Sequence, residues 1–377
     1  MGDLLRGKRR RGVIAAVAVV AIAVLAASIG AAASKSAPTK ASATPRVAFL
    51  LPENVTPRWN GSDKPAFVKA LGKLYKGVKI DVLNANNQPD TQTSQAEDEI
   101  TKGAKVLVVA AIDGKAFGNV AKRAINQGVK VIAYDRLIAG AKISAYVSFN
   151  SVTVGHAMGA WMKAHTKKGA RVAIINGSNT DANAHYVNTG MLQVFKPLFK
   201  SGARKVVGPA TGTWTPGWTP TTAQREMEQL LTKNKNKINA VLSANDGVAG
   251  GIISALKAQK LAGKVPVTGQ DASLEGIQNI IRKYQGMSVF KDIRKQAPAA
   301  AAIANALLRG KKKLPGVNSR TANASGSLIP SVILPVKAVG YANLGLLVRN
   351  GWVNTPGIGG LKNVCKGVPK QSICKNA

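Results

Sequence analysis

The stretch Val129-Lys130-Val131-Ile132-Ala133-Tyr134-Asp135-Arg136 joins an apolar, strand-like run to a polar cluster. The same arrangement occurs twice more, where 240–242 runs into Ser243-Ala244-Asn245-Asp246 and 265–268 runs into Gly269-Gln270-Asp271. In open α/β sheets, ligands bind beyond the carboxyl ends of the strands. The three polar strand ends therefore predict a binding site for a small polar molecule.

Around this stretch, from Arg46 onward, strand-like and helix-like segments alternate with short connections. This alternation is typical of parallel sheets built from βαβ units. A second series of such segments follows Asn150, and the late segments near 287–291, 296–309 and 331–335 are too few for a third domain. The sequence thus predicts an α/β fold of two doubly wound parallel-sheet lobes. A three-segment hinge would join them, with crossings near Phe149, Phe290 and Leu334.

The amino terminus has the pattern of an export signal. A basic start precedes an apolar run from Val13 to Ile29 and the small residues Ala31 to Ala33, as in a cleaved secretory signal. The length of the run leaves an uncleaved membrane anchor as the alternative. We expect a secreted or envelope-associated protein, in the periplasm or on the outer face of the cytoplasmic membrane. The predicted parts are a signal peptide (1–33), a spacer (34–45), an N-terminal lobe (46–149 and 291–334) and a C-terminal lobe (150–290 and 335–377).

Lysine and arginine outnumber aspartate and glutamate by 53 to 17 in this 377-residue chain, which gives a formal charge of +36. Such an excess creates a positive field that attracts anionic partners. The lysines are scattered singly and not gathered with aromatic residues, so we expect attraction to an anionic cell envelope and no nucleic-acid binding. A hydrophobic content of 45% excludes a disordered or multi-span membrane chain.

The two cysteines, Cys365 and Cys374, both lie in the carboxy-terminal tail. An oxidising, extracytoplasmic location allows them to pair, so the sequence predicts a Cys365–Cys374 disulfide. The alternatives are two free thiols or two metal ligands, but the absence of a nearby histidine makes this a poor zinc pattern. We expect no metal site and no cofactor.

Seven short motifs carry a resemblance to a known family. They are Arg58-Trp59, Tyr134-Asp135-Arg136, Asp181-Ala182-Asn183-Ala184, Gly217-Trp218, Asn245-Asp246, Gly269-Gln270-Asp271 and Phe290-Lys291. In this order and spacing they resemble the type I periplasmic sugar-binding proteins of ABC transporters, most closely the D-xylose-binding members. The resemblance covers residues 46–340.

That resemblance implies two lobes that enclose a sugar, and a closed form that docks on an ABC permease. The sugar contacts it implies are Arg58, Asp135 and Arg136 in the first lobe, Asn183, Trp218, Asn245 and Asp271 in the second, and Lys291 beside a hinge. Thr215-Pro216 before Gly217 departs from the family pattern, which leaves Trp214 as the alternative to Trp218. The high positive charge and the tail cysteines are further departures.

The chemistry of these side chains suits a pyranose. Charged and amide groups match sugar hydroxyls, and aromatic planes match the face of C–H groups. Trp59, just after the first strand, is a candidate stacking wall. Near Asn183 and Asn245, which we assign to the sugar, Asp181 and Asp246 are the candidate helix caps. The charged residues of the predicted site sum to one excess positive charge, which does not exclude a sugar acid.

The sequence therefore predicts a monomeric, non-enzymatic solute receptor. It would capture a monosaccharide, xylose or a similar pentose, and deliver it to an ABC permease. A glycosidase that uses Asp135 and Asp271 is disfavoured because cationic neighbours would keep both ionised. The alternatives are a sugar receptor for a sensor kinase or chemoreceptor, and a sugar-responsive transcription regulator, whose amino-terminal DNA-binding motif is replaced here by the export signal.

Overall fold

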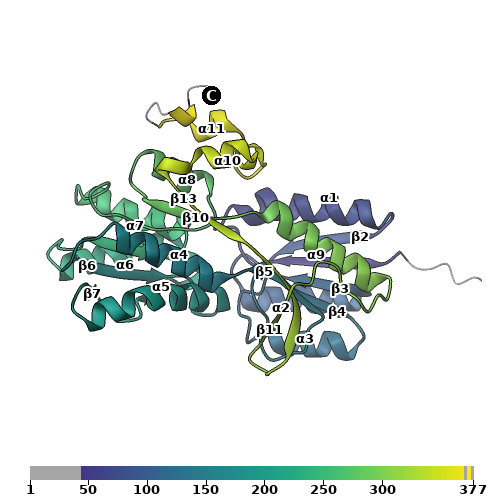
Figure 1. Ribbon diagram of the computed structural model, residues 1–377. Helices are drawn as coiled ribbons and strands as arrows, with labels where there is room; N and C mark the ends of the chain where they lie inside the picture. The colour runs from purple at the N-terminus through teal and green to yellow at the C-terminus, as the bar shows by residue number, and fades with distance from the viewer. Residues whose placement is uncertain (1–43, 369–371, 375–377) are drawn as a thin grey trace, which may run out of the picture. The chain divides into compact units, whose positions relative to one another are not determined.

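The computed structural model describes residues 44–368 and 372–374. The predicted signal peptide and almost all of the predicted spacer lie outside the described residues. From Thr44 onward the chain forms one compact unit that contains two parallel sheets flanked by helices (Figure 1), which confirms the predicted fold class. None of the helices in this part of the chain is long and apolar enough to cross a membrane.

The first lobe is built on a seven-stranded sheet in the order β11-β12-β5-β4-β3-β1-β2. Every neighbouring pair is parallel except β11 and β12, which are antiparallel at one edge. The strands are β1 (Arg46–Leu51), β2 (Lys79–Asn84), β3 (Ala104–Val109), β4 (Lys130–Tyr134), β5 (Ala145–Phe149), β11 (Ser319–Ala322) and β12 (Leu328–Leu334).

Two pairs of helices cover the two faces of this sheet, as Figure 1 shows. On one face lie α1 (Lys64–Leu74) and α9 (Ile293–Leu308), and on the other α2 (Pro89–Thr101) and α3 (Phe117–Asn126). Side chains alternate across a strand, so Phe49 of β1 packs with α1 and α9 while Leu50 packs with α2 and α3. A short π-helix, η1 (Trp59–Asp63), precedes α1.

The second lobe has a four-stranded parallel sheet in which β6 pairs with β7, β8 and β9. Its strands are β6 (Arg171–Asn176), β7 (Lys205–Val207), β8 (Thr213–Trp214) and β9 (Ala240–Ser243). Its helices are α4 (Ser151–Ala164), α5 (Ala182–Lys200), η2 (Pro216–Trp218), α6 (Pro220–Lys233), α7 (Asp246–Ala258) and α8 (Leu274–Ile281). A separate antiparallel pair joins β10 (Met287–Lys291) and β13 (Val336–Gly340).

The predicted strand over 265–268 is present only as isolated bridges, one between Val241 and Val267 and one between Ala262 and Val265. The segment still lies beside β9, because Val241 donates to Pro266 O and Thr268 donates back to Val241 O. Pro266 has no N–H to give to a ladder, which prevents a regular strand here. The segment nevertheless delivers Gly269-Gln270-Asp271 to the sheet edge, as the strand would.

The chain passes between the elements of the two lobes at three places: from β5 to α4, from β10 to α9, and from β12 to β13. These places lie near Phe149, Lys291 and Leu334. The β12 strand belongs to the first sheet, whereas β13 pairs with β10. The exact lobe boundaries stay a prediction.

The carboxy-terminal segment packs against α8 through a cluster that includes Ile277, Leu347, Trp352 and Val364. Its short elements are η3 (Tyr341–Asn343), α10 (Gly345–Arg349), η4 (Trp352–Asn354), α11 (Leu361–Val364) and η5 (Ser372–Cys374). Cys365 and Cys374 form a disulfide, which confirms the predicted pairing.

We expect that reduction of this disulfide lowers the unfolding free energy by about 2–3 kcal/mol, because the cross-link restricts the unfolded chain. The measurement is denaturant unfolding with and without dithiothreitol. In the variant Cys365→Ser/Cys374→Ser, dithiothreitol should have no further effect. An equal effect of dithiothreitol on that variant would contradict the assignment.

Candidate functional site

A pocket is lined by side chains from both lobes, and all nine predicted site residues lie in its lining. The lining residues are Thr56, Arg58, Trp59, Asp135, Arg136, Asp181, Asn183, Trp218, Asn245, Gln270, Asp271 and Lys291. Most of them follow the carboxyl end of a strand or of the strand-like segment 265–268, as the rule for α/β sheets requires.

The backbone at three of these positions is unusual. Asp135, Trp218 and Asp271 have φ angles of 63°, 59° and 95°, in the left-handed region that residues with a side chain rarely adopt. Such conformations cost about 1–3 kcal/mol each and cluster at functional sites. Their coincidence in one pocket is an independent sign that this pocket is the functional site.

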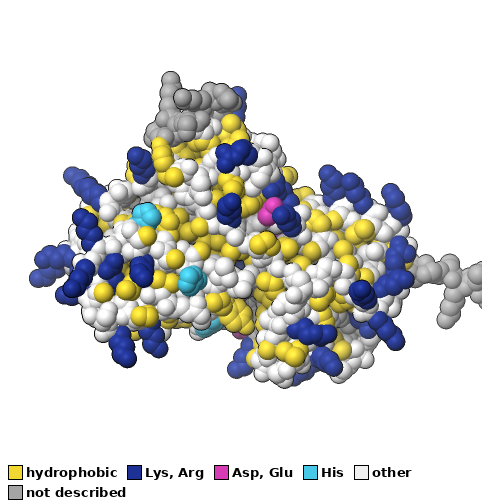
Figure 2. Space-filling model, viewed as in Figure 1, with side chains coloured by type: hydrophobic (Ala, Val, Ile, Leu, Met, Phe, Trp, Pro, Cys, Tyr) yellow, Lys and Arg dark blue, Asp and Glu magenta, His cyan; other side chains and the backbone are white. Residues whose placement is uncertain are grey.

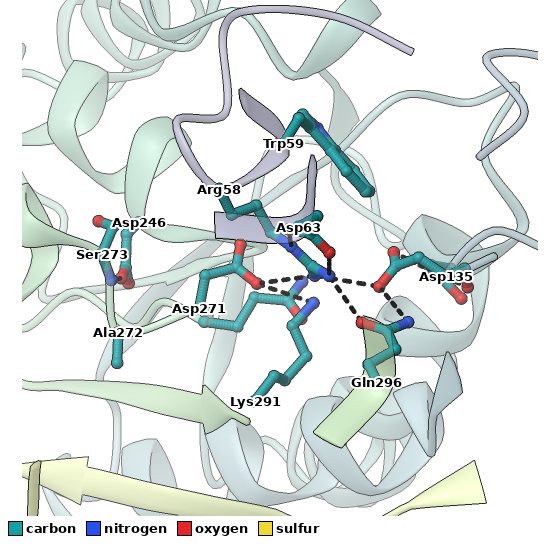
Figure 3. Close-up of polar contacts among 12 residues, drawn as sticks. Arg58, Trp59, Asp63, Asp135, Asp246, Asp271, Ala272, Ser273, Lys291 and Gln296 are labelled. Atoms are coloured by element: carbon teal, nitrogen blue, oxygen red, sulfur yellow. Dashed lines mark hydrogen bonds and ion pairs between the residues drawn. The ribbon is translucent and has the colours of Figure 1, made fainter. Parts of the chain in front are cut away.

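The centre of the pocket is an ion-pair network around Arg58 (Figure 3). Its Nη1 donates to Asp135 Oδ2 at 3.0 Å and lies 3.9 Å from Asp271 Oδ1, and Lys291 Nζ lies 2.8 Å from that same Asp271 oxygen. Burial would raise the pKa of Asp135, but Arg58, Lys291 and Arg136 outweigh burial and hold the pKa well below its ordinary value. Asp135 is therefore an ionised acceptor.

Three side chains behind the lining fix Arg58 and Asp135 in place. Arg58 makes a two-point contact with Asp63, at 2.9 Å and 2.7 Å, and Tyr134 donates its hydroxyl to Asp63. Gln296 of α9 accepts from Arg58 at 2.7 Å and donates to Asp135 Oδ2 at 3.2 Å and to Val147 O at 3.1 Å. Both charged groups are thus oriented before any ligand arrives.

Asn183 makes a direct contact between the lobes. Its Nδ2 donates to the Asp135 backbone oxygen at 2.9 Å and to Asp135 Oδ1 at 3.1 Å. Asp181 caps α5 by accepting from the Asn183 backbone N–H, which confirms its predicted role. It also lines the pocket, which the sequence analysis did not predict.

The predicted roles of Asn245 and Asp246 are wrong in one respect. Asn245 Oδ1 accepts from the Val248 backbone N–H at 2.8 Å and is the cap of α7, whereas Asp246 is the first helical residue. Asn245 is extended, with φ −152° and ψ 176°, which is the backbone of an N-cap residue. It lines the pocket as well.

Asp246 instead holds the loop that carries Asp271. Its Oδ2 accepts from the Ser273 backbone N–H at 2.9 Å, and its Oδ1 accepts from Gln285 and Ser288 at 2.8 Å each. Figure 3 shows Asp246 beside Ser273 and apart from the Arg58 network. Burial, with the nearby charge of Asp271, raises the pKa of Asp246 to about 7.

Of the candidate stacking walls, Trp59 and Trp218 line the pocket and are only 2% and 5% exposed. Trp214 is not part of the lining. Its ring packs against His185 with ring centroids 4.4 Å apart. The turn at Gly217 and Trp218, both with positive φ, brings Trp218 to the pocket after Thr215-Pro216.

Several residues of the site were not predicted from the sequence. Thr56 and Gln270 line the pocket, and Glu53, Asp63 and Gln296 support it. Glu53 follows the carboxyl end of β1 by two residues. The rule that ligands bind beyond the carboxyl ends of strands, here called the strand-end rule, could therefore have identified it. Asp63 and Gln296 sit in or beside helices and carry no such signal.

These additional residues change the charge of the site. The lining contains three cations (Arg58, Arg136 and Lys291) and three carboxylates (Asp135, Asp181 and Asp271). Two further buried carboxylates, Glu53 and Asp63, contact Arg136 and Arg58 from behind. The sequence-based count of one excess positive charge is therefore wrong, because carboxylates equal or outnumber the cations.

Comparison with known proteins places this geometry in a family. Residues 47–312 match the family model described as "Periplasmic binding protein domain". The chain belongs to the periplasmic binding protein family. It is 42% identical over 255 residues to the D-xylose-binding periplasmic protein of Escherichia coli K12, an alignment that covers 68% of this chain and 75% of the relative. The corresponding protein of Haemophilus influenzae is 38% identical over 76% of this chain and 83% of its own length.

Solved structures agree with this membership. A solute-binding protein from Clostridium phytofermentans, solved with bound β-D-glucose, superposes with a TM-score of 0.75 at 30% identity. The match covers 83% of this chain and 99% of that one. Members of this family are carriers and not enzymes. In the described part of this member, no group of three or more His, Cys, Asp or Glu side chains is arranged to hold a metal ion.

Lysine and arginine side chains are spread over the face seen in Figure 2, and few acidic groups appear among them. They do not gather into a single stripe on that face. A field of this kind is non-specific. Attraction to an anionic envelope and the absence of nucleic-acid binding stay predictions.

Proposed function

We propose that this chain captures a monosaccharide, xylose or a similar pentose, in the pocket between the lobes and delivers it to an ABC permease. The observation that carries the proposal is the convergence of nine sequence-predicted residues, from segments up to 233 positions apart (Arg58 to Lys291), on one pocket. The named ligands of the relatives, xylose and glucose, support the same class of ligand.

The lining has the chemistry that a pyranose needs. Asp135 and Asp271 can accept hydrogen bonds from sugar hydroxyls, while Arg58, Arg136, Lys291 and the amide groups of Asn183 and Asn245 can donate to them. Charge-assisted bonds of this kind are about twice as strong as neutral ones. Trp59 and Trp218 supply flat apolar surface for the C–H face of the ring. We assign all nine predicted residues to the sugar on this basis.

The charge balance favours a neutral sugar over a sugar acid or a sugar phosphate. Each buried cation already has a carboxylate partner, as in the pairs Arg58–Asp135 and Lys291–Asp271. An added anion would have to displace one of those partners, and an unpaired buried charge is costly. This supports a neutral monosaccharide as the ligand.

Delivery to a permease follows from closure. Contacts from both lobes exist only when the lobes are together, so the ligand shifts the population toward the closed form that a permease can recognise. The alternative is that a sensor kinase or chemoreceptor reads the same closed form. A secreted or envelope-associated location and a monomeric state complete the proposal.

The test is calorimetric titration with D-xylose, L-arabinose, D-ribose, D-glucose, D-glucuronate and D-glucose 6-phosphate. A pentose has about ten heavy atoms, which permits a Kd near 1 μM, or about −8 kcal/mol, within the efficiency limit for tiny ligands. We expect tight binding of at least one neutral sugar and no binding of the two anions. Absence of binding to every monosaccharide in the panel would refute the proposal.

A further inference from the structure

A series of buried polar contacts joins the two tryptophans of the pocket. Trp59 donates its indole N–H to Glu53 Oε1 at 2.5 Å, and Trp218 donates its indole N–H to Asp181 Oδ2 at 3.2 Å. Arg136 connects these two carboxylates. Its Nη2 donates to Glu53 Oε1 at 3.5 Å, and its Nε lies 2.9 Å from Asp181 Oδ2. We call these five residues the tryptophan relay.

The relay is almost completely removed from solvent. Its members are between 0% and 5% exposed. A buried carboxylate without its cation is strongly unfavourable, so Glu53 and Asp181 both depend on Arg136. A planar guanidinium can serve two carboxylates at once and can also stack on an aromatic face. The Arg136 guanidinium carbon lies 5.4 Å from the centroid of the Trp59 ring.

The relay also crosses from one lobe to the other. Glu53, Trp59 and Arg136 follow strands of the first lobe, whereas Asp181 and Trp218 belong to the second. The Arg136–Asp181 pair is the link that separation of the lobes must break. Asp181 is itself fixed, because its other oxygen caps α5.

Trp218 is held from a second direction as well. A Cβ added to Gly177 would lie 2.3 Å from the Trp218 ring. The ring therefore packs directly on the Gly177 backbone, with no space for a side chain between them. With one side against Gly177 and its N–H on Asp181, the indole has little freedom to turn.

We propose that Glu53 and Asp181 are positioning residues, which act through Arg136 to align Trp59 with Trp218. The relay is complete only when the lobes are together, so the second tryptophan is aligned with the first only in the closed state. This makes stacking of the ligand depend on closure. The inference rests on the proposed function for the identity of that ligand, a neutral pyranose.

The first test is made with D-xylose at saturating concentration, because the relay is complete only when the lobes are together. Indole N–H resonances of ¹⁵N-tryptophan-labelled protein report on each of the five tryptophans. We expect Glu53→Gln to shift the resonances of both Trp59 and Trp218, and Asp181→Asn to do the same. In an Arg136→Met background each substitution should shift only its own tryptophan. Trp352, which donates to Ala272 O outside the relay, is the internal reference.

The second test measures D-xylose affinity by calorimetry. Loss of a hydrogen bond to a charged group should weaken binding about ten- to hundred-fold in each single variant. In the double variant, the fold-loss of D-xylose affinity should be smaller than the product of the fold-losses in the two single variants, because both residues act through Arg136. The matched control is Glu99→Gln, which removes a 1% exposed carboxylate paired with Arg46 and Lys102 and should change neither readout.

The two proposals fail separately. If Glu53→Gln and Asp181→Asn each shift only their own tryptophan while Arg136 is retained and D-xylose is bound, the relay is wrong although the proposed function stands. If the wild type binds no monosaccharide, the proposed function is refuted, and the sugar-free spectra decide the relay: a shift of both Trp59 and Trp218 in each variant supports it, and a shift of only one tryptophan in each variant overturns it. If Asp181→Asn does not fold, the relay is tested by Glu53→Gln alone, through the shift of the Trp218 indole resonance.

Discussion

Asp135→Ala is expected to reduce D-xylose affinity about 30- to 5000-fold, equivalent to about 2–5 kcal/mol, which is the usual cost of truncating one partner of a buried charge pair. The carboxylate is the common partner of Arg58, Gln296 and Asn183. Its removal takes away a hydroxyl acceptor and also releases three donors whose orientation depends on it. The measurement is calorimetric titration with D-xylose.

The fold should survive this change because Arg58 keeps its two-point contact with Asp63. Far-ultraviolet circular dichroism should therefore match the wild type. Asp135→Asn removes the charge but keeps the size of the side chain. It should therefore weaken D-xylose binding less than Asp135→Ala does. The control is Asp90→Ala, an exposed carboxylate in the first turn of α2. Unchanged xylose affinity in Asp135→Ala would remove Asp135 from the site.

The strand-end rule explains why so much of this pocket was predictable. Asp135, Asn245 and Asp271 each follow an apolar run, and parallel strands bring all such ends to one edge of their sheet. Even the irregular segment around Pro266 keeps this property, because its backbone still bonds to β9. The rule depends on chain direction and sheet order more than on regular strand geometry.

What the rule cannot give is the choice between neighbouring side chains. Asn245 and Asp246 are both good helix caps, and only the extended backbone at Asn245 decides that it, and not Asp246, caps α7. The supporting residues Asp63 and Gln296 are 233 positions apart and meet only through Arg58. No local pattern in the sequence marks such a meeting.

Because Asn245 is the cap of α7, Asp246 is the first helical residue and its carboxylate is buried. We expect this buried carboxylate to make the stability of the protein depend strongly on pH. Asp246 has a folded-state pKa of about 7, raised from 3.8 by burial and by the charge of Asp271. The folded protein thus binds this proton more tightly than the unfolded chain. The resulting stabilisation is fully present below about pH 4, is lost as the pH rises to about 7, and is absent above that.

Asp246→Asn cannot titrate, so it isolates this effect. When the pH rises from 4 to 8, the wild type should lose about 4 kcal/mol of unfolding free energy relative to the variant. Denaturant unfolding at the two pH values measures it. Asp90→Asn, at an exposed position, is the matched control and should show little change.

An equal difference between Asp246→Asn and wild type at both pH values would show that folding does not raise the pKa of Asp246. The three donors around it, from Ser273, Gln285 and Ser288, would then outweigh burial and the charge of Asp271. The charged groups near Asp271 are Arg58 and Lys291, so removing Lys291 should expose Asp246 to more of the Asp271 charge. Lys291→Met should therefore raise the pKa of Asp246 further and move the pH-dependent loss of stability to higher pH.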